Sequence, residues 1–319
     1  MTAERSVAAD ASATVSGVFW AVATAFSYSL SAVVGKDLLG ALGAPSLLFW
    51  RFGIATVVLW AVVLLSRPAQ GMRVPGVAPW LSLLIGVMFG LLVYVGFKSL
   101  ETLDASVYIV VVYVYPVIVV VASSLLGHRT SPVMWVALAM VMGGIVLTVP
   151  ELFGGVGEID TRGMVLAIAQ AVMFAAYMIV NSRIVPAHAD GTVTAAWTVL
   201  GAAIALAPMV VVDGLVVPDT QLLALKVLMF ALVPTVIATA CFFRAMRRVS
   251  PGVVAMIMSL EIALAILWSV LFLGERPRAI QYAGAGIVIA AVLLAQWVGL
   301  RDERQRIREL EVLGASSAP

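Results

Sequence analysis

Ten long apolar runs follow one another along the chain, separated by short segments that contain charged residues, proline or glycine. Strict apolar–polar alternation is absent, and each run is longer than the roughly 10 residues of a barrel strand. About 20 apolar residues in a helix are enough to cross a bilayer. The pattern therefore predicts ten transmembrane helices. Their ranges are 17–35, 46–66, 79–98, 105–126, 132–149, 163–182, 193–212, 222–243, 251–273 and 279–299.

Composition excludes a soluble chain and several kinds of chemistry. Of the 319 residues, 63% are hydrophobic and 11% are charged, whereas soluble domains average about 25% charged residues. We therefore expect an all-α integral membrane protein. One cysteine, Cys241, and two histidines rule out a disulfide framework and argue against a metal centre. We expect no cofactor, and the net charge of +2 gives no reason to expect a nucleic-acid partner.

The distribution of basic residues predicts the orientation. If the N-terminus lies inside, twelve of the 19 lysines and arginines fall on the inside, six fall outside, and Arg51 lies near or within a span. Cytoplasmic loops carry an excess of lysine and arginine. We therefore expect a multi-pass protein of the cell membrane, the inner membrane of a bacterium, with both termini in the cytoplasm. Residues 1–16 lack the features of a cleavable signal peptide.

The two halves of the chain match each other at a nearly constant offset. An offset of 147 pairs Lys36 with Arg183 and Trp50 with Trp197, and the segments "LLGHRTSP" and "FLGERPRA" occupy equivalent places. Each half carries five predicted spans, so the second half must enter the membrane from the opposite side. The expected organisation is two inverted repeats, at 17–149 and 163–299, joined by an extracytoplasmic loop, 150–162. A cytoplasmic segment, 1–16, precedes them and a cytoplasmic tail, 300–319, follows.

Inverted repeats are the usual basis of alternating access, with the substrate site near the midplane. The organisation therefore predicts a secondary transporter of a small molecule. The sequence has no G-x-x-x-x-G-K-[ST] motif, so transport is expected to use an ion gradient or the substrate's own gradient.

Several sequence motifs are similar to those of a known transporter family. The segments "FWRFGIA", at the start of the second span, and "SLEIALAILWSVLFLGERP", in which Glu261 stands thirteen residues before Gly274, occur together with a glycine-rich last span. Over residues 17–299 the chain resembles the EamA branch of the drug/metabolite transporter superfamily. The resemblance implies a ten-helix bundle with cytoplasmic termini that exports small metabolites, such as amino acids, through a central cavity. It names no single substrate, and import on the same fold stays open.

Polar and aromatic side chains inside the predicted spans are the candidates for substrate binding. One stripe on the first span and another on the sixth recur at helical spacing, so each occupies one helix face. Tyrosines in the third and fourth spans add an apolar wall with hydroxyl groups. Helix–helix hydrogen bonding is the alternative role for these side chains. The candidates are Thr24, Ser27, Ser31, Tyr94, Tyr115, Gln170, Tyr177 and Asn181.

Two charged residues, Glu261 and Arg51, are candidates for coupling or for a structural role. Glu261 is the only acid placed deep in a predicted span, where a charge is costly. It either couples protons, binds a substrate amine, or clasps neighbouring helices. Arg51 is either an interfacial side chain, a contact for a substrate carboxylate, or a helix lock. Pro116 and Pro234 are expected to interrupt their helices.

Two other classes of protein are less consistent with the sequence. A membrane enzyme needs clustered acids, histidines or a nucleophile–base pair, and Glu261 has no such companion at its depth. A structural membrane subunit has no evident use for an inverted repeat. Glycines in the fifth and tenth spans mark packing seams and leave a homodimer open. These glycines are Gly143, Gly144, Gly284 and Gly286.

Overall fold

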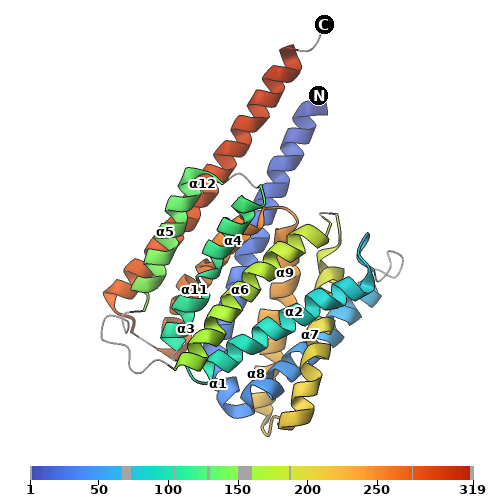
Figure 1. Ribbon diagram of the computed structural model, residues 1–319, viewed down its shortest axis with the longest axis vertical. Coiled ribbons are helices and arrows are strands. Elements are labelled where there is room, and N and C mark those ends of the chain that lie inside the picture. The colour runs from blue at the N-terminus through green and yellow to red at the C-terminus, as the bar shows by residue number, and fades with distance from the viewer. Residues whose placement is uncertain are drawn as a thin grey trace.

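The computed structural model describes residues 2–66, 73–103, 105–127, 130–149, 160–186, 188–274 and 276–316. Within these ranges every regular element is a helix (Figure 1). Most of the predicted connecting loop, residues 150–159, lies outside them. The elements are α1 (Thr2–Ser66), α2 (Pro79–Leu100), α3 (Ala105–Val112), α4 (Tyr115–Leu125), α5 (Pro132–Leu147), α6 (Thr161–Ile184), α7 (Gly191–Asp213), α8 (Gln221–Ala231), the π-helix η2 (Leu232–Ile237), α9 (Ala238–Met246), α10 (Pro251–Met258), α11 (Leu260–Leu273) and α12 (Ala279–Ser316).

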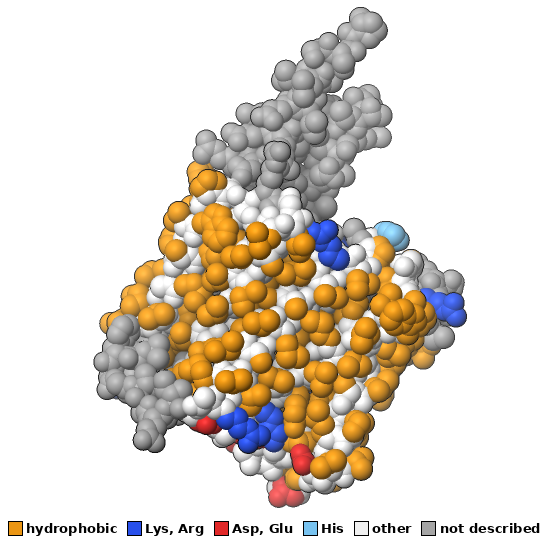
Figure 2. Space-filling view, in the orientation of Figure 1, with side chains coloured by type: hydrophobic (Ala, Val, Ile, Leu, Met, Phe, Trp, Pro, Cys, Tyr) orange, Lys and Arg blue, Asp and Glu red, His pale blue; other side chains and the backbone are white. Residues whose placement is uncertain are grey.

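The prediction of an all-helical membrane protein is confirmed. Eight helical stretches of the described chain are long and apolar enough to cross a membrane, and α5 is a shorter apolar helix. The first part of α1 contains the predicted run 17–35. Figure 2 shows hydrophobic side chains spread over one face of the molecule, with charged side chains at its margins. Such a surface suits contact with lipid rather than water.

Helix α1 is divided at Gly43 into two arms. Gly43 has a φ of 69°, a conformation that glycine adopts without steric cost. Pro45 follows and has no N–H to continue the ladder. We call this point the elbow, and the end of the bundle that contains it the elbow end. Both chain termini lie at the opposite end, the terminal end (Figure 1).

Three of the predicted runs are broken inside the bundle. The run 105–126 consists of α3 and α4, which are interrupted at Tyr113 and Val114. The run 222–243 contains the π-helical segment η2, which includes Pro234. The run 251–273 is interrupted at Ser259, between α10 and α11. The expected interruptions at Pro116 and Pro234 are confirmed, whereas no proline marks the break at Ser259.

Close helix contacts depend on small residues. Helix α2 packs against α7, and a Cβ atom added to Gly201 would lie 2.3 Å from the carbonyl oxygen of Leu83 and 2.8 Å from the Cα of Gly86. Helix α5 packs against α12 in the same way, where a Cβ at Gly144 would lie 2.9 Å from the oxygen of Gly284. The backbones can approach this closely because no side chains separate them.

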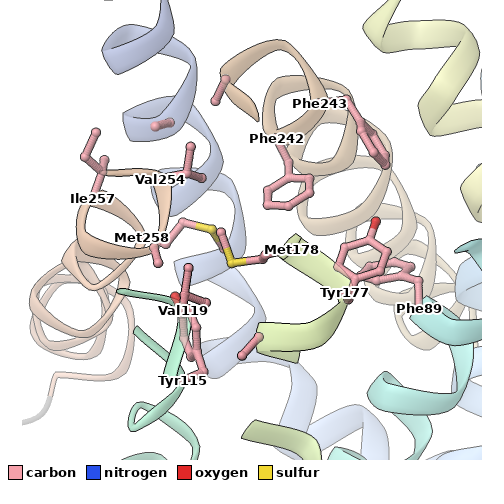
Figure 3. Packing of buried hydrophobic residues seen from close by; sticks show 14 of the residues in the cluster. Phe89, Tyr115, Val119, Tyr177, Met178, Phe242, Phe243, Val254, Ile257 and Met258 are labelled. Carbon is pink, nitrogen blue, oxygen red and sulfur yellow. The ribbon is translucent and has the colours of Figure 1, made fainter. Parts of the chain in front are cut away.

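The apolar core is continuous through the middle of the bundle and divided at the elbow end. Its main cluster includes Tyr177, which lies between Phe89 and Phe242 (Figure 3). At the elbow end there are two separate smaller clusters. One is built on α1 and α8 around Leu38 and Phe230, and the other joins α3 to α6.

Candidate functional site

The carboxyl group of Glu261 lies between two broken helices. Glu261 is in the first turn of α11, directly after the break at Ser259, and its side chain is half-buried. Unpaired N–H groups give the start of a helix a positive potential that favours a carboxylate. The hydroxyl of Tyr113, at the break between α3 and α4, lies within hydrogen-bonding reach of Glu261. The two interruptions therefore face each other at this carboxyl group.

Further tyrosines surround Glu261. Tyr28, Tyr108 and Tyr115 all lie near enough to interact electrostatically with its carboxyl group. The Tyr108 hydroxyl donates a 2.7 Å hydrogen bond to Oε1 of Gln170. Tyr115 is 2% exposed, and its hydroxyl has no hydrogen-bond partner among the described residues. The result is an aromatic wall with several hydroxyl groups, one of them free to bond a ligand.

Arg51 is buried and held by the η2 segment. Its side chain is 4% exposed, so the interfacial interpretation is wrong. Nε donates to Oγ1 of Thr235 at 2.7 Å, and Nη2 donates to the carbonyl oxygen of Pro234 at 2.9 Å. The guanidinium also lies 4.7 Å from the ring centre of Phe230 and 5.6 Å from that of Phe52, which is cation–π range.

The local sequence explains how η2 holds this cation. Pro234 has no N–H, so it leaves the carbonyl of Phe230, four residues earlier, without its helical donor. The hydroxyl of Thr235 donates to that carbonyl at 3.3 Å and accepts from Arg51 at the same time. The proline and the threonine together build a polar socket inside an apolar helix.

Arg51 and Glu261 interact electrostatically without touching. Each charge acts on the other, yet the described residues contain no ion pair between them. Tyr28 lies in the field of both. Sequence reasoning missed Tyr28 and Tyr113. The motif Tyr113-Val114-Tyr115 before a proline was the available signal for Tyr113, whereas nothing in the sequence distinguishes Tyr28.

Most of the remaining predicted residues are buried, and two of them hydrogen-bond within their own helices. The hydroxyl of Thr24 donates to the carbonyl of Trp20 in its own helix at 2.8 Å, and Asn181 Nδ2 donates to the carbonyl of Tyr177 at 2.9 Å. Of the predicted residues, Thr24, Tyr177 and Asn181 are buried, and so is Ser27. Ser31 is partly buried, and its Oγ has no partner among the described residues.

Tyr94 lies towards the elbow end. It is half-buried, and its ring centre is 5.9 Å from Nζ of Lys98. The predicted candidates that the structure brings close to Glu261 are therefore Arg51, Tyr115 and, through Tyr108, Gln170.

Arginines close the terminal end of the bundle. Arg247, just after α9, donates to the carbonyls of Pro186 and Ala189 and to the hydroxyl of Thr194. Burial lowers the pKa of the Arg247 guanidinium to about 10, so it stays charged at neutral pH. Its neighbour Arg244 packs 5.1 Å from the ring centre of Trp20. These contacts connect α9 with the α6–α7 link and, through Trp20, with α1.

Comparison with known proteins agrees with this architecture. The model of the EamA-like transporter family matches residues 15–149 and 161–297. The threonine/homoserine exporter RhtA of Escherichia coli is 27% identical over 291 residues, which cover 88% of this chain and 90% of RhtA. The pseudopaline exporter CntI of Pseudomonas aeruginosa is 26% identical, covering 87% and 95% of the two chains. The riboflavin transporter of Rhizobium johnstonii is 26% identical, covering 95% and 98%.

A solved crystal structure shares the fold. It aligns with a TM-score of 0.78 and 22% sequence identity, covering 91% of this chain and 98% of the other. The family match and the relatives named as exporters indicate a membrane transporter rather than an enzyme. The two family-model matches make the assignment specific: the chain belongs to the EamA-like transporter family.

Proposed function

We propose that this transporter exports small amphiphilic metabolites, such as amino acids or related compounds, by alternating access. The observation that carries the proposal is the internal site itself, where Glu261, Arg51 and several tyrosines lie at helix breaks within an apolar bundle. Relatives named as exporters of threonine and homoserine and of pseudopaline support both the direction and the substrate class. Import of a small metabolite on the same fold is the second candidate.

We also propose ten membrane helices arranged as two inverted repeats, 17–149 and 163–299. The packing supports this organisation because its contacts occur in matching pairs. Helices α3 and α4 pack on α6 as α10 and α11 pack on α1, while α2 packs on α7 as α8 to α9 pack on α1. At an offset of 146 residues, Tyr113 corresponds to Ser259 and Tyr115 to Glu261. The two helix breaks are then symmetry mates, and the halves rock about the site between them.

Glu261 is the proposed protonation site for coupling to a proton gradient. A homodimer is the open alternative to a monomer. Gly144 and Gly284 already pack against each other within one chain. Gly143 and Gly286, by contrast, have nothing within 4 Å of an added Cβ, so only these two are left to support a dimer seam between α5 and α12 of two copies.

Transport in proteoliposomes tests the function. Vesicles loaded with an unlabelled amino acid are expected to accumulate the labelled form by counterflow, since a carrier exchanges substrate without energy input. The panel contains threonine, homoserine, other amino acids and a cationic drug, and vesicles without protein are the blank. Counterflow of no compound, with correctly folded protein in the vesicles, would contradict the proposal.

Cysteine labelling tests the orientation of the terminal end. The only cysteine, Cys241, is buried, so Cys241→Ser provides a background without a reactive thiol. In that background we expect Asp219→Cys, at the elbow end, to react with a membrane-impermeant maleimide on intact cells. Arg73→Cys, at the terminal end, should react only after lysis. Both positions are exposed. The reverse pattern would place the termini outside the cell.

A further inference from the structure

We propose that Arg51 and Glu261 form the two poles of a binding site for a zwitterion. Arg51 binds the carboxylate and Glu261 binds the ammonium of an α-amino acid or a compound with the same pair of charges. This inference rests on the proposed transport function and specifies the substrate class. It assigns each of these two charged side chains a binding partner in the substrate.

The geometry of Arg51 leaves it able to bind a carboxylate. A guanidinium has five N–H donors, and the observed bonds to Thr235 and Pro234 involve Nε and Nη2. No hydrogen bond from Nη1 is observed among the described residues. The rings of Phe230 and Phe52 hold the guanidinium in place. A fixed fork with a free edge is well suited to recognising a carboxylate.

The surroundings of Glu261 suit an ammonium group. Its half-buried carboxyl group is near the hydroxyls of Tyr28, Tyr108, Tyr113 and Tyr115. An ammonium has three donors and no acceptor, so one carboxylate and nearby hydroxyl oxygens can satisfy it. The Tyr115 hydroxyl lacks a partner in a nearly sealed position. An unsatisfied buried hydroxyl indicates a missing bonded group, such as a ligand or an ordered water.

Electrostatics favours a ligand that carries both charges. A buried charge is costly unless it is paired. Arg51 and Glu261 have opposite charges and interact electrostatically, but they form no ion pair in the described chain. A zwitterion placed between them gives each a direct charge-assisted hydrogen bond and adds no net charge to the bundle. A simple cation or anion neutralises only one of the two.

Competition against labelled threonine counterflow tests the inference. The probes are L-threonine, L-threonine amide, which lacks the carboxylate, and 2,3-dihydroxybutanoate, which lacks the amine. For the wild-type protein we expect threonine to compete at least about tenfold better than either analogue, because a site built for a charged group rejects compounds that lack it. Arg51→Gln should reduce the advantage of threonine over the amide to about threefold or less. Its advantage over the deaminated analogue should remain.

Glu261→Gln should have the complementary effect on competition, because it removes the partner of the ammonium and leaves Arg51 in place. The advantage over 2,3-dihydroxybutanoate should be lost, while the advantage over the amide is kept. Lys226→Gln is the matched control. Lys226 is a cation at the elbow end that pairs with Asp37 and lies outside the site, so this variant should keep both ratios.

The outcomes separate the inference from the function on which it rests. Counterflow of the cationic drug that no amino acid of the panel inhibits would leave transport established and overturn the zwitterion site. Equal competition by all three probes on the wild type would overturn it as well, even if every variant failed to fold. Variants that fold and lose rate but keep wild-type ratios would show that Arg51 and Glu261 act only structurally. Absence of any counterflow would refute the proposed function itself.

Discussion

Replacing Glu261 by glutamine is expected to abolish the response of transport to an imposed pH gradient. The groups that face this carboxyl group are Arg51 and four tyrosines, Tyr28, Tyr108, Tyr113 and Tyr115. Arginine and tyrosine do not change charge near neutral pH at their ordinary pKa values. Glu261 is then the only group of this cluster suited to exchanging a proton during transport. Its amide replacement keeps the shape of the side chain and cannot ionise.

The measured quantity is the ratio of threonine flux with and without a pH gradient, at each variant's own half-saturating concentration. For the wild type the ratio should depart clearly from one, and for Glu261→Gln it should equal one. Glu101→Gln is the control, because Glu101 is an exposed acid paired with Lys98 at the elbow end. A full pH response in Glu261→Gln would assign coupling to another group and leave Glu261 a role in binding or packing.

The helices were predictable because their signal is local. Long apolar runs bounded by proline, glycine and charge indicate membrane helices directly, and α2, α6 and α7 extend only a few residues beyond their predicted runs. Helix interruptions were predictable only where a proline causes them. The break at Ser259 has no proline beside it, and in the folded chain it faces the break at Tyr113. Pairing of two distant segments leaves no mark in either local sequence.

The site was only partly predictable for the same reason. Glu261 stands out in any apolar run because a buried acid is costly, and it lies in the observed cluster. Arg51 looked interfacial because it is eight residues from the elbow, and only the fold shows Pro234 and Thr235 around it. Tyr177 has the right spacing for a cavity face but stacks in the core (Figure 3). Periodicity identifies a buried face and does not separate cavity from core.

Gly201→Ala is expected to destabilise the protein strongly, against the usual effect of this substitution in a helix. The new Cβ would lie 2.3 Å from the carbonyl oxygen of Leu83 and 2.8 Å from the Cα of Gly86. Both are backbone atoms of α2, so the clash is relieved only by moving α2 away from α7. Overpacking of this kind costs about 1–3 kcal/mol, and more where backbones must part. The melting temperature in detergent should fall.

For Gly53→Ala we expect the opposite effect on stability. An added Cβ there has nothing within 4 Å, so only the helix propensity changes, and alanine is favoured over glycine by up to about 1 kcal/mol. Its melting temperature should stay the same or rise, with unchanged counterflow. Two variants that shift stability in the same direction would contradict the close α2–α7 seam. Opposite shifts would show that the seam fixes the spacing of α2, which packs against α6, and α7, which packs against α1.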